Sequence, residues 1–113
     1  MPTVALLMDT PLEVDVTTAV QLLREGALLL DVREDSEVAT CAIAGSRHVP
    51  MGQVPGNLPA LPRDRLILVH CHHGGRSLRV TQFLRANGFA RVSNVAGGID
   101  AWATQIDPSL ARY

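Results

Sequence analysis

Metal-ligating and nucleophilic side chains are concentrated in one short stretch, VHCHHGGRS, at residues 69–77. Its first part, residues 70–73 (HCHH), contains the side-chain types that bind transition metals. Its second part, residues 74–77 (GGRS), could form a loop whose backbone N–H groups hold an anion. Cys71 would be a metal ligand in the first case and a nucleophile in the second.

A closed metal site at this stretch is disfavoured. His70 and Cys71 end a predicted strand, and neighbouring strand residues point to opposite faces. Cys71 and His73 could share an ion, but a structural zinc site needs four ligands, usually grouped as spaced pairs. The remaining thiol and the remaining histidine, Cys41 and His48, form no second paired motif. We therefore expect no metal here.

The nucleophile hypothesis accounts for more of the residues. Gly74 and Gly75 can adopt backbone angles that are closed to other residues, so successive N–H groups can turn inward. The start of the following helix adds positive potential, and the pKa of a Cys71 thiol there should fall below about 8.5. Arg76 could contact an anionic substrate or help to hold the loop. The alternative, a buried cysteine before a glycine turn, explains neither the second glycine nor Arg76 and Ser77.

The elements that would position this loop alternate between apolar runs and amphipathic segments. Strands are predicted at residues 13–16, 27–32, 48–51, 66–70 and 91–95. Helices are predicted from a capping box at residues 18–21 to Gly26, and at residues 34–40, 77–86 and 99–105, with further helical turns between residues 55 and 62. This alternation predicts an α/β fold with a mostly parallel sheet and helices on both faces. Ligands of such sheets bind beyond the carboxyl ends of the strands, where Cys71 lies.

Length and composition limit the possible functions. A chain of 113 residues with 47% hydrophobic residues fits one domain, expected over residues 1–113 with a core at about 13–104. A net charge of -1 gives no reason to expect nucleic-acid binding. The apolar run at residues 4–8 is too short to cross a membrane, and a cytoplasmic protein is expected. The chain contains no lysine, which excludes Schiff-base chemistry and a Walker-type phosphate loop.

Four segments resemble, in order and spacing, the successive signatures of a single-domain rhodanese. They are DVRE at residues 31–34, IAGSRHVP at 43–50, CHHGGRS at 71–77 and NVAGGIDAW at 94–102. The resemblance covers about residues 13–104 and implies a rhodanese-like fold and sulfurtransferase activity, in which a loop cysteine carries the transferred sulfur as a persulfide. By position, Cys71 is the nucleophile. The residues that would surround it in the active-site loop are His72, His73, Gly74, Gly75, Arg76 and Ser77.

The length of the loop distinguishes among relatives of that fold. Cys71 and Arg76 are separated by four residues, the spacing that the family associates with sulfur transfer. Phosphatases and arsenate reductases of the same fold have five residues there, and a wider ring. The alternatives are a non-catalytic binding module, which would not need the intact loop, and such a phosphatase.

In further detail, the chain resembles the rhodanese domain fused to bacterial sulfur-carrier adenylyltransferases. The resemblance implies a small sulfur donor and an acceptor thiol as partners. A sulfur-carrier protein or its adenylyltransferase is a further possible partner, and neither nucleic acid nor a membrane is expected to be one. No cofactor is expected.

Other residues have two interpretations. Asp31 and Arg33 end a strand at the edge where Cys71 lies, and they either orient the loop or form a structural ion pair. His72 and His73 either tune substrate entry or face solvent. The second thiol, Cys41, is expected to be a free cysteine.

Residues outside the loop have simpler interpretations. Trp102 is expected in the core, and Gly97 and Gly98 either approach the loop closely or form a plain turn. Arg63 and Arg65 precede the strand at 66–70 and are interpreted as solvated charges at the opposite end of the sheet.

Overall fold

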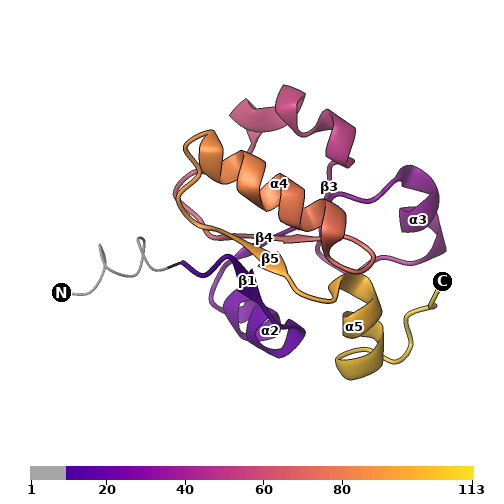
Figure 1. The fold of residues 1–113 in the computed structure, drawn as a ribbon. Helices are drawn as coiled ribbons and strands as arrows, with labels where there is room; N and C mark the ends of the chain where they lie inside the picture. Colours follow the sequence, from indigo (N-terminus) through magenta and orange to yellow (C-terminus); the bar gives the residue numbers. More distant parts are fainter. Residues whose placement is uncertain (1–9) are drawn as a thin grey trace.

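A computed structural model of the chain describes residues 10–113 and shows a parallel β-sheet covered by helices on both faces (Figure 1). The predicted α/β class is confirmed. The apolar run at residues 4–8 lies outside the described residues. Within residues 10–113, no helix is both long and apolar enough to cross a membrane.

Five parallel strands form the sheet, in the order β1-β5-β4-β2-β3. They are β1 (Glu13–Val14), β2 (Leu28–Asp31), β3 (Arg47–His48), β4 (Ile67–His70) and β5 (Val92–Val95). Every residue of the three central strands, β2, β4 and β5, is buried. Because the strands run in one direction, their carboxyl ends meet at one edge, and Cys71 follows β4 at that edge.

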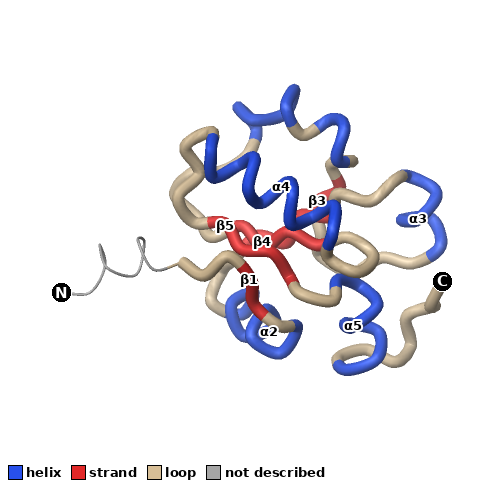
Figure 2. Tube along the Cα trace, viewed as in Figure 1, coloured by secondary structure: helices blue, strands red, loops and turns tan. Residues whose placement is uncertain are grey.

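The helices lie in two layers (Figure 2). Helices α2 (Val16–Arg24) and α5 (Gly98–Gln105) pack together on one face. The other face is covered by α4 (Gly75–Ala86), which contacts the 3₁₀ helix η1 (Met51–Gln53); η1 is followed by η2 (Pro55–Ala60). The short helix α3 (Asp35–Thr40) lies beside the end of the chain in Figure 1.

The alternation of side chains along the strands divides the core into two clusters. Leu28 and Leu30 of β2 belong to the cluster that includes residues of α4, whereas Leu29 belongs to the cluster that includes residues of α2 and α5. Trp102 is 6% exposed and lies in the second cluster, which confirms its predicted place in the core. Burying a side chain such as Leu30 contributes about 1.5–3 kcal/mol, so these clusters fix the strands from which the loop extends.

Several boundaries differ from the prediction by one or two residues, and two of these differences have a clear physical cause. The first helix begins at Val16 and is capped by Asp15, whose carboxylate accepts a hydrogen bond from the Thr18 backbone N–H at 2.7 Å. The capping box predicted at residues 18–21 was therefore wrong. The strand predicted at residues 48–51 is β3 at Arg47–His48, because Pro50 has no N–H to extend the ladder and a 3₁₀ helix follows it.

Candidate active site

The Cys71 sulfur accepts hydrogen bonds from the loop and from the first turn of α4. The Cys71 side chain is 1% exposed, and its Sγ accepts a hydrogen bond from the Gly74 backbone N–H at 3.2 Å. The Ser77 backbone N–H and the Ser77 hydroxyl also donate to Sγ, at 3.4 and 3.3 Å. Ser77 is in the first turn of α4, so the helix N-terminus points its free N–H groups at the sulfur. The loop can therefore hold a thiolate.

The surroundings of Cys71 act on its pKa in two directions. Burial opposes ionisation and raises the pKa, but the hydrogen bonds from Ser77, Gly74 and the Arg76 backbone lower it further than burial raises it. The net result is a Cys71 pKa below its ordinary value. A larger fraction of the buried thiol is consequently present as thiolate, the nucleophilic form, at neutral pH.

The two loop glycines have different roles. Gly74 has φ +113°, a left-handed angle that favours glycine, and it turns its N–H toward the sulfur. Gly75 does not have a positive φ, and a Cβ placed on it would meet no atom within 4 Å. The expectation that Gly75 also needs special backbone angles was wrong. It is an ordinary first residue of α4.

A third glycine allows the start of α5 to approach the loop closely. Gly98, at the start of α5, has φ +57°, and a Cβ there would lie 2.6 Å from the His72 carbonyl oxygen. The Ile99 and Asp100 backbone N–H groups donate to the Cys71 and His72 carbonyl oxygens, at 2.9 and 3.1 Å. Of the two interpretations of Gly97 and Gly98, the structure therefore supports the close approach to the loop. Helix α5 and the loop are joined backbone to backbone.

Arg76 is bound to an acidic residue. Its guanidinium donates to both carboxylate oxygens of Glu37 in α3, at 2.6 and 2.8 Å. The hydrogen bonds from the Arg76 guanidinium are the largest effect on the pKa of Glu37, and they lower it. Burial raises this pKa, whereas hydrogen bonds from the Glu34 backbone and Tyr113 lower it further, to about 2. Of the two roles expected for Arg76, this contact corresponds to holding the loop.

Asp31 and Arg33 form a buried ion pair at the carboxyl end of β2. Arg33 Nη2 lies 2.7 Å from Asp31 Oδ2, with both side chains at most 1% exposed. Arg33 also donates to the Cys41 carbonyl oxygen and the Tyr113 hydroxyl, at 2.8 and 2.9 Å. These contacts link β2 to the segments around the loop and do not reach Cys71. The structural interpretation of the pair is the one that the geometry supports.

His70 lies beside this pair as a neutral side chain. It is fully buried, its Nε2 is 3.7 Å from Asp31 Oδ2, and neither ring nitrogen has a hydrogen-bond partner among the described residues. Burial lowers the pKa of His70 to about 4, with the Asp31 charge acting in the opposite direction. A neutral His70 cannot serve as a cation for the substrate.

Two positioning residues were missed from the sequence. Asn94, fully buried at the end of β5, donates to the Gly74 carbonyl oxygen at 3.1 Å and to Glu13 at 2.7 Å. Tyr113 stacks on His72, with ring centroids 4.0 Å apart and an interplanar angle of 6°. Asn94 could have been found as a large polar residue in a short strand that begins and ends with valine, whereas Tyr113 carries no local signal.

The two loop histidines differ in environment. His72 is partly buried between Tyr113 and His73, whereas the His73 side chain is 69% exposed. His73 Nε2 lies 3.8 Å from Asp100 Oδ2 in α5. One ligand atom from each of His72, His73 and Asp100 lies within 4.8 Å of the other two, so these three residues could hold a metal ion.

Cys41 and Cys71 pack with different core clusters, on opposite faces of the sheet. Both cysteines are free, Cys71 belongs to the core cluster on the α4 side, and Cys41 packs against the cluster on the opposite side. A disulfide between them would need the two Cα atoms within about 7 Å and side chains that face each other.

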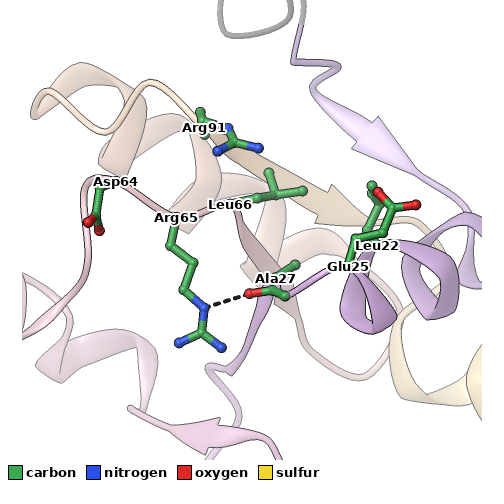
Figure 3. Close-up of a pocket in the computed structure, with 8 residues that line it drawn as sticks. Leu22, Glu25, Ala27, Asp64, Arg65, Leu66 and Arg91 are labelled. Atoms are coloured by element: carbon green, nitrogen blue, oxygen red, sulfur yellow. Dashed lines mark hydrogen bonds between the residues drawn. The ribbon is translucent and has the colours of Figure 1, made fainter. Parts of the chain in front are cut away.

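The end of the sheet opposite Cys71 contains a shallow pocket (Figure 3). Arg65 lines it and donates from Nε to the Gly26 carbonyl oxygen at 2.6 Å. Arg63 donates to the Asn87 carbonyl oxygen at 2.9 Å and lies over the Phe89 ring. Both arginines are exposed, as expected for solvated charges, and each also donates a hydrogen bond to a loop carbonyl at this end. Their place at the end away from Cys71 was predicted correctly.

The site and the fold together define a class of protein: a parallel α/β domain with a free, buried cysteine in an amide-lined loop after its central strand. The model of the rhodanese-like domain family matches residues 15–105. The chain belongs to this family, as its motifs indicated.

Two curated relatives and a solved structure illustrate the match. A protein named sulfurtransferase from Allochromatium vinosum is 36% identical over 87 residues, which are 77% of this chain and 81% of the relative. An adenylyltransferase and sulfurtransferase from Zea mays, MOCS3-2, is 33% identical over 79% of this chain, which spans only 20% of that protein. The crystal structure of a rhodanese-like domain protein from Staphylococcus aureus superposes with a TM-score of 0.76 at 30% identity, covering 89% of this chain and 97% of the other.

Proposed function

We propose that the protein is a sulfurtransferase that carries sulfur as a Cys71 persulfide, with thiosulfate as a donor. The observation that carries the proposal is the set of three hydrogen bonds to Cys71 Sγ from Gly74 and Ser77. These donors favour the thiolate and would also stabilise the negative charge of a persulfide or of a leaving thiolate. Membership in the rhodanese-like family supports the same reaction.

The reaction takes two displacements. In the first, the Cys71 thiolate attacks the outer sulfur of thiosulfate, a new S–S bond forms, and the original S–S bond breaks with its electron pair leaving on sulfite. In the second, an acceptor nucleophile such as cyanide or a thiolate attacks the terminal sulfur of the persulfide. The Cys71 thiolate is thereby regenerated. No external electron donor is consumed when cyanide is the acceptor, and the chain's own groups are sufficient for both steps.

The loop geometry favours this function over that of an oxyanion-transferring enzyme. Arg76, the cation that ends the loop, is held by two hydrogen bonds to Glu37. A phosphatase would need this guanidinium to clasp a tetrahedral dianion inside the ring. The natural acceptor is proposed to be a protein or small-molecule thiol; a sulfur-carrier protein is one candidate, given the likeness to the Zea mays relative.

Thiocyanate formation from thiosulfate and cyanide tests the proposal. We expect turnover by the wild type and none by Cys71→Ser, because a hydroxyl cannot form a persulfide. Intact mass spectrometry after thiosulfate alone should show one added sulfur, about 32 Da, that dithiothreitol removes. Cys41→Ala is the matched control and should keep both properties. Turnover by Cys71→Ser, or an adduct that depends on Cys41, would contradict the proposal.

A further inference from the structure

The loop contains two polar side chains that donate no hydrogen bond to Cys71 Sγ. His72 and His73 follow the nucleophile, yet their rings contact Tyr113 and each other, and no contact joins them to Cys71 Sγ among the hydrogen bonds of the described residues. Nε2 of His72 is buried and has no hydrogen-bond partner within residues 10–113. A buried nitrogen left without a partner is destabilising, so it needs an explanation.

A carboxylate lies next to both histidines. Asp100 is in the first turn of α5, and its backbone N–H donates to the His72 carbonyl oxygen at 3.1 Å, which fixes its distance from the loop. Its Oδ2 lies 3.8 Å from His73 Nε2, and the three potential ligand atoms lie within 4.8 Å of one another. Small side-chain rotations would bring all three to the roughly 2.0–2.2 Å from a single ion that zinc ligands adopt.

We propose that His72, His73 and Asp100 form a binding site for a divalent cation of borderline softness, with Zn²⁺ as the representative ion. Two imidazoles and a carboxylate suit such ions better than Mg²⁺ or Ca²⁺, which prefer oxygen ligands alone. Three protein ligands leave a fourth position to water. Coordination through His72 Nε2 would also give that buried nitrogen the partner that it lacks among the described residues. Cys71 is not a ligand, which separates this site from the four-ligand arrangement that the sequence disfavours.

Arg112 would compete with the cation for the Asp100 carboxylate. Its Nε and Nη2 donate to the Asp100 carboxylate at 3.1 and 3.3 Å, and its side chain is 59% exposed. An exposed ion pair of this kind contributes little stability, so a dication can displace it. The arginine then becomes free to move into solvent. Removing Arg112 should therefore strengthen metal binding, an effect that a merely structural role of Asp100 would not produce.

The cation would tie the active-site loop to α5. His72 is the residue directly after Cys71, and Asp100 belongs to the helix whose N-terminal N–H groups already hold the loop carbonyls. An added side-chain link between the same two elements should slow their relative motion. The proposed cation site is therefore adjacent to Cys71 but does not include it.

Calorimetric titration of Zn²⁺ at fixed neutral pH tests the site in the full chain carrying Cys71→Ser and Cys41→Ala, which removes competing thiols. We expect one ion bound per chain. His73→Ala and Asp100→Asn should each weaken binding by about tenfold or more, and Arg112→Gln should strengthen it a few-fold. His48→Ala is the matched control: His48 lies 3.8 Å from Asp35, but no third ligand within residues 10–113 completes that pair.

Two results would overturn the proposal. One is the absence of Zn²⁺ binding at millimolar concentration in a variant whose circular dichroism shows it to be folded. The other is binding that His73→Ala and Asp100→Asn leave unchanged, which would place the ion elsewhere. Because the readout is binding in a chain without Cys71, the outcome does not depend on the sulfurtransferase activity.

Discussion

Arg76 of the active-site loop and Glu37 of α3 form a bidentate ion pair, in which the guanidinium donates to both carboxylate oxygens at 2.6 and 2.8 Å. The same carboxylate accepts hydrogen bonds from the Glu34 backbone N–H at 3.0 Å and from the Tyr113 hydroxyl at 2.8 Å. Glu37 therefore joins α3, the loop and residue 113 at one point. The loop is held from outside by this acid as well as from inside by its hydrogen bonds to sulfur.

Replacing Glu37 with Gln should destabilise the protein at neutral pH by about 1–3 kcal/mol, because charge-assisted hydrogen bonds are lost at a partly exposed site. The folded pKa of Glu37, about 2, is below its ordinary value of 4.5. Its contribution is therefore complete above about pH 4.5 and is lost as the pH falls toward 2. We expect the difference in unfolding free energy between wild type and Glu37→Gln to shrink over that range, as measured by urea denaturation.

The exposed Glu25 provides the control for this experiment. It accepts a hydrogen bond only from Gln21 among the side chains of the described residues, and Glu25→Gln should change stability little at any pH. A pH-independent gap for Glu37→Gln would show that the carboxylate charge is not what holds the loop.

Tyr113 should support the loop chiefly through its ring. Tyr113→Phe keeps the stacking on His72 and loses two hydrogen bonds of the hydroxyl, so it should cost about 0.5–1.5 kcal/mol of stability and little activity. Tyr113→Ala also loses the stack and should lower kcat/KM for thiosulfate several-fold. If the two variants lost activity equally, the hydroxyl rather than the ring would be the positioning group. Thermal unfolding and thiocyanate formation measure both effects.

Two glycines give opposite predictions for the same substitution. Gly98→Ala puts a Cβ against the loop carbonyls at a positive φ, so we expect a loss of about 1–3 kcal/mol and of most sulfur transfer. Gly75→Ala meets open space at an ordinary φ and should keep stability and activity near wild type. Melting temperature and initial rate, measured on both variants together, check the pair. Equal damage from both would mean that the loop tolerates no added side chain at all.

The sequence predicts the class of fold and the nucleophile because both depend on local patterns. The apolar runs at β2 and β4 and the glycine loop after Cys71 are contiguous, and their consequences follow from strand and helix geometry. The partners of the loop are not contiguous. Glu37 lies 39 residues from Arg76, and Tyr113 lies 80 residues from Arg33. No spacing rule pairs such residues, since only the folded chain brings them together.

The same reasoning explains the errors. Two adjacent glycines look alike in sequence, but only Gly74 turns its N–H toward the sulfur, while Gly75 already belongs to α4. Similarly, Asp15 and Thr18 are both good helix caps, and the choice of Asp15 depends on where β1 ends.

The pKa of Cys71 should be below its ordinary value and should depend on Ser77. Burial raises this pKa, and the hydroxyl and backbone N–H of Ser77 are the largest of the opposing effects. In the Cys41→Ala background, only Cys71 reports on alkylation, so the rate of reaction with iodoacetamide against pH gives its titration. Ser77→Ala should move the midpoint upward and slow alkylation at pH 7, because one donor to the thiolate is lost while burial remains. Ser93 is another buried serine, and its hydroxyl donates to the Pro11 carbonyl oxygen. The control variant Ser93→Ala should leave the midpoint in place. A midpoint that Ser77→Ala leaves unchanged would mean that the backbone N–H groups alone stabilise the thiolate.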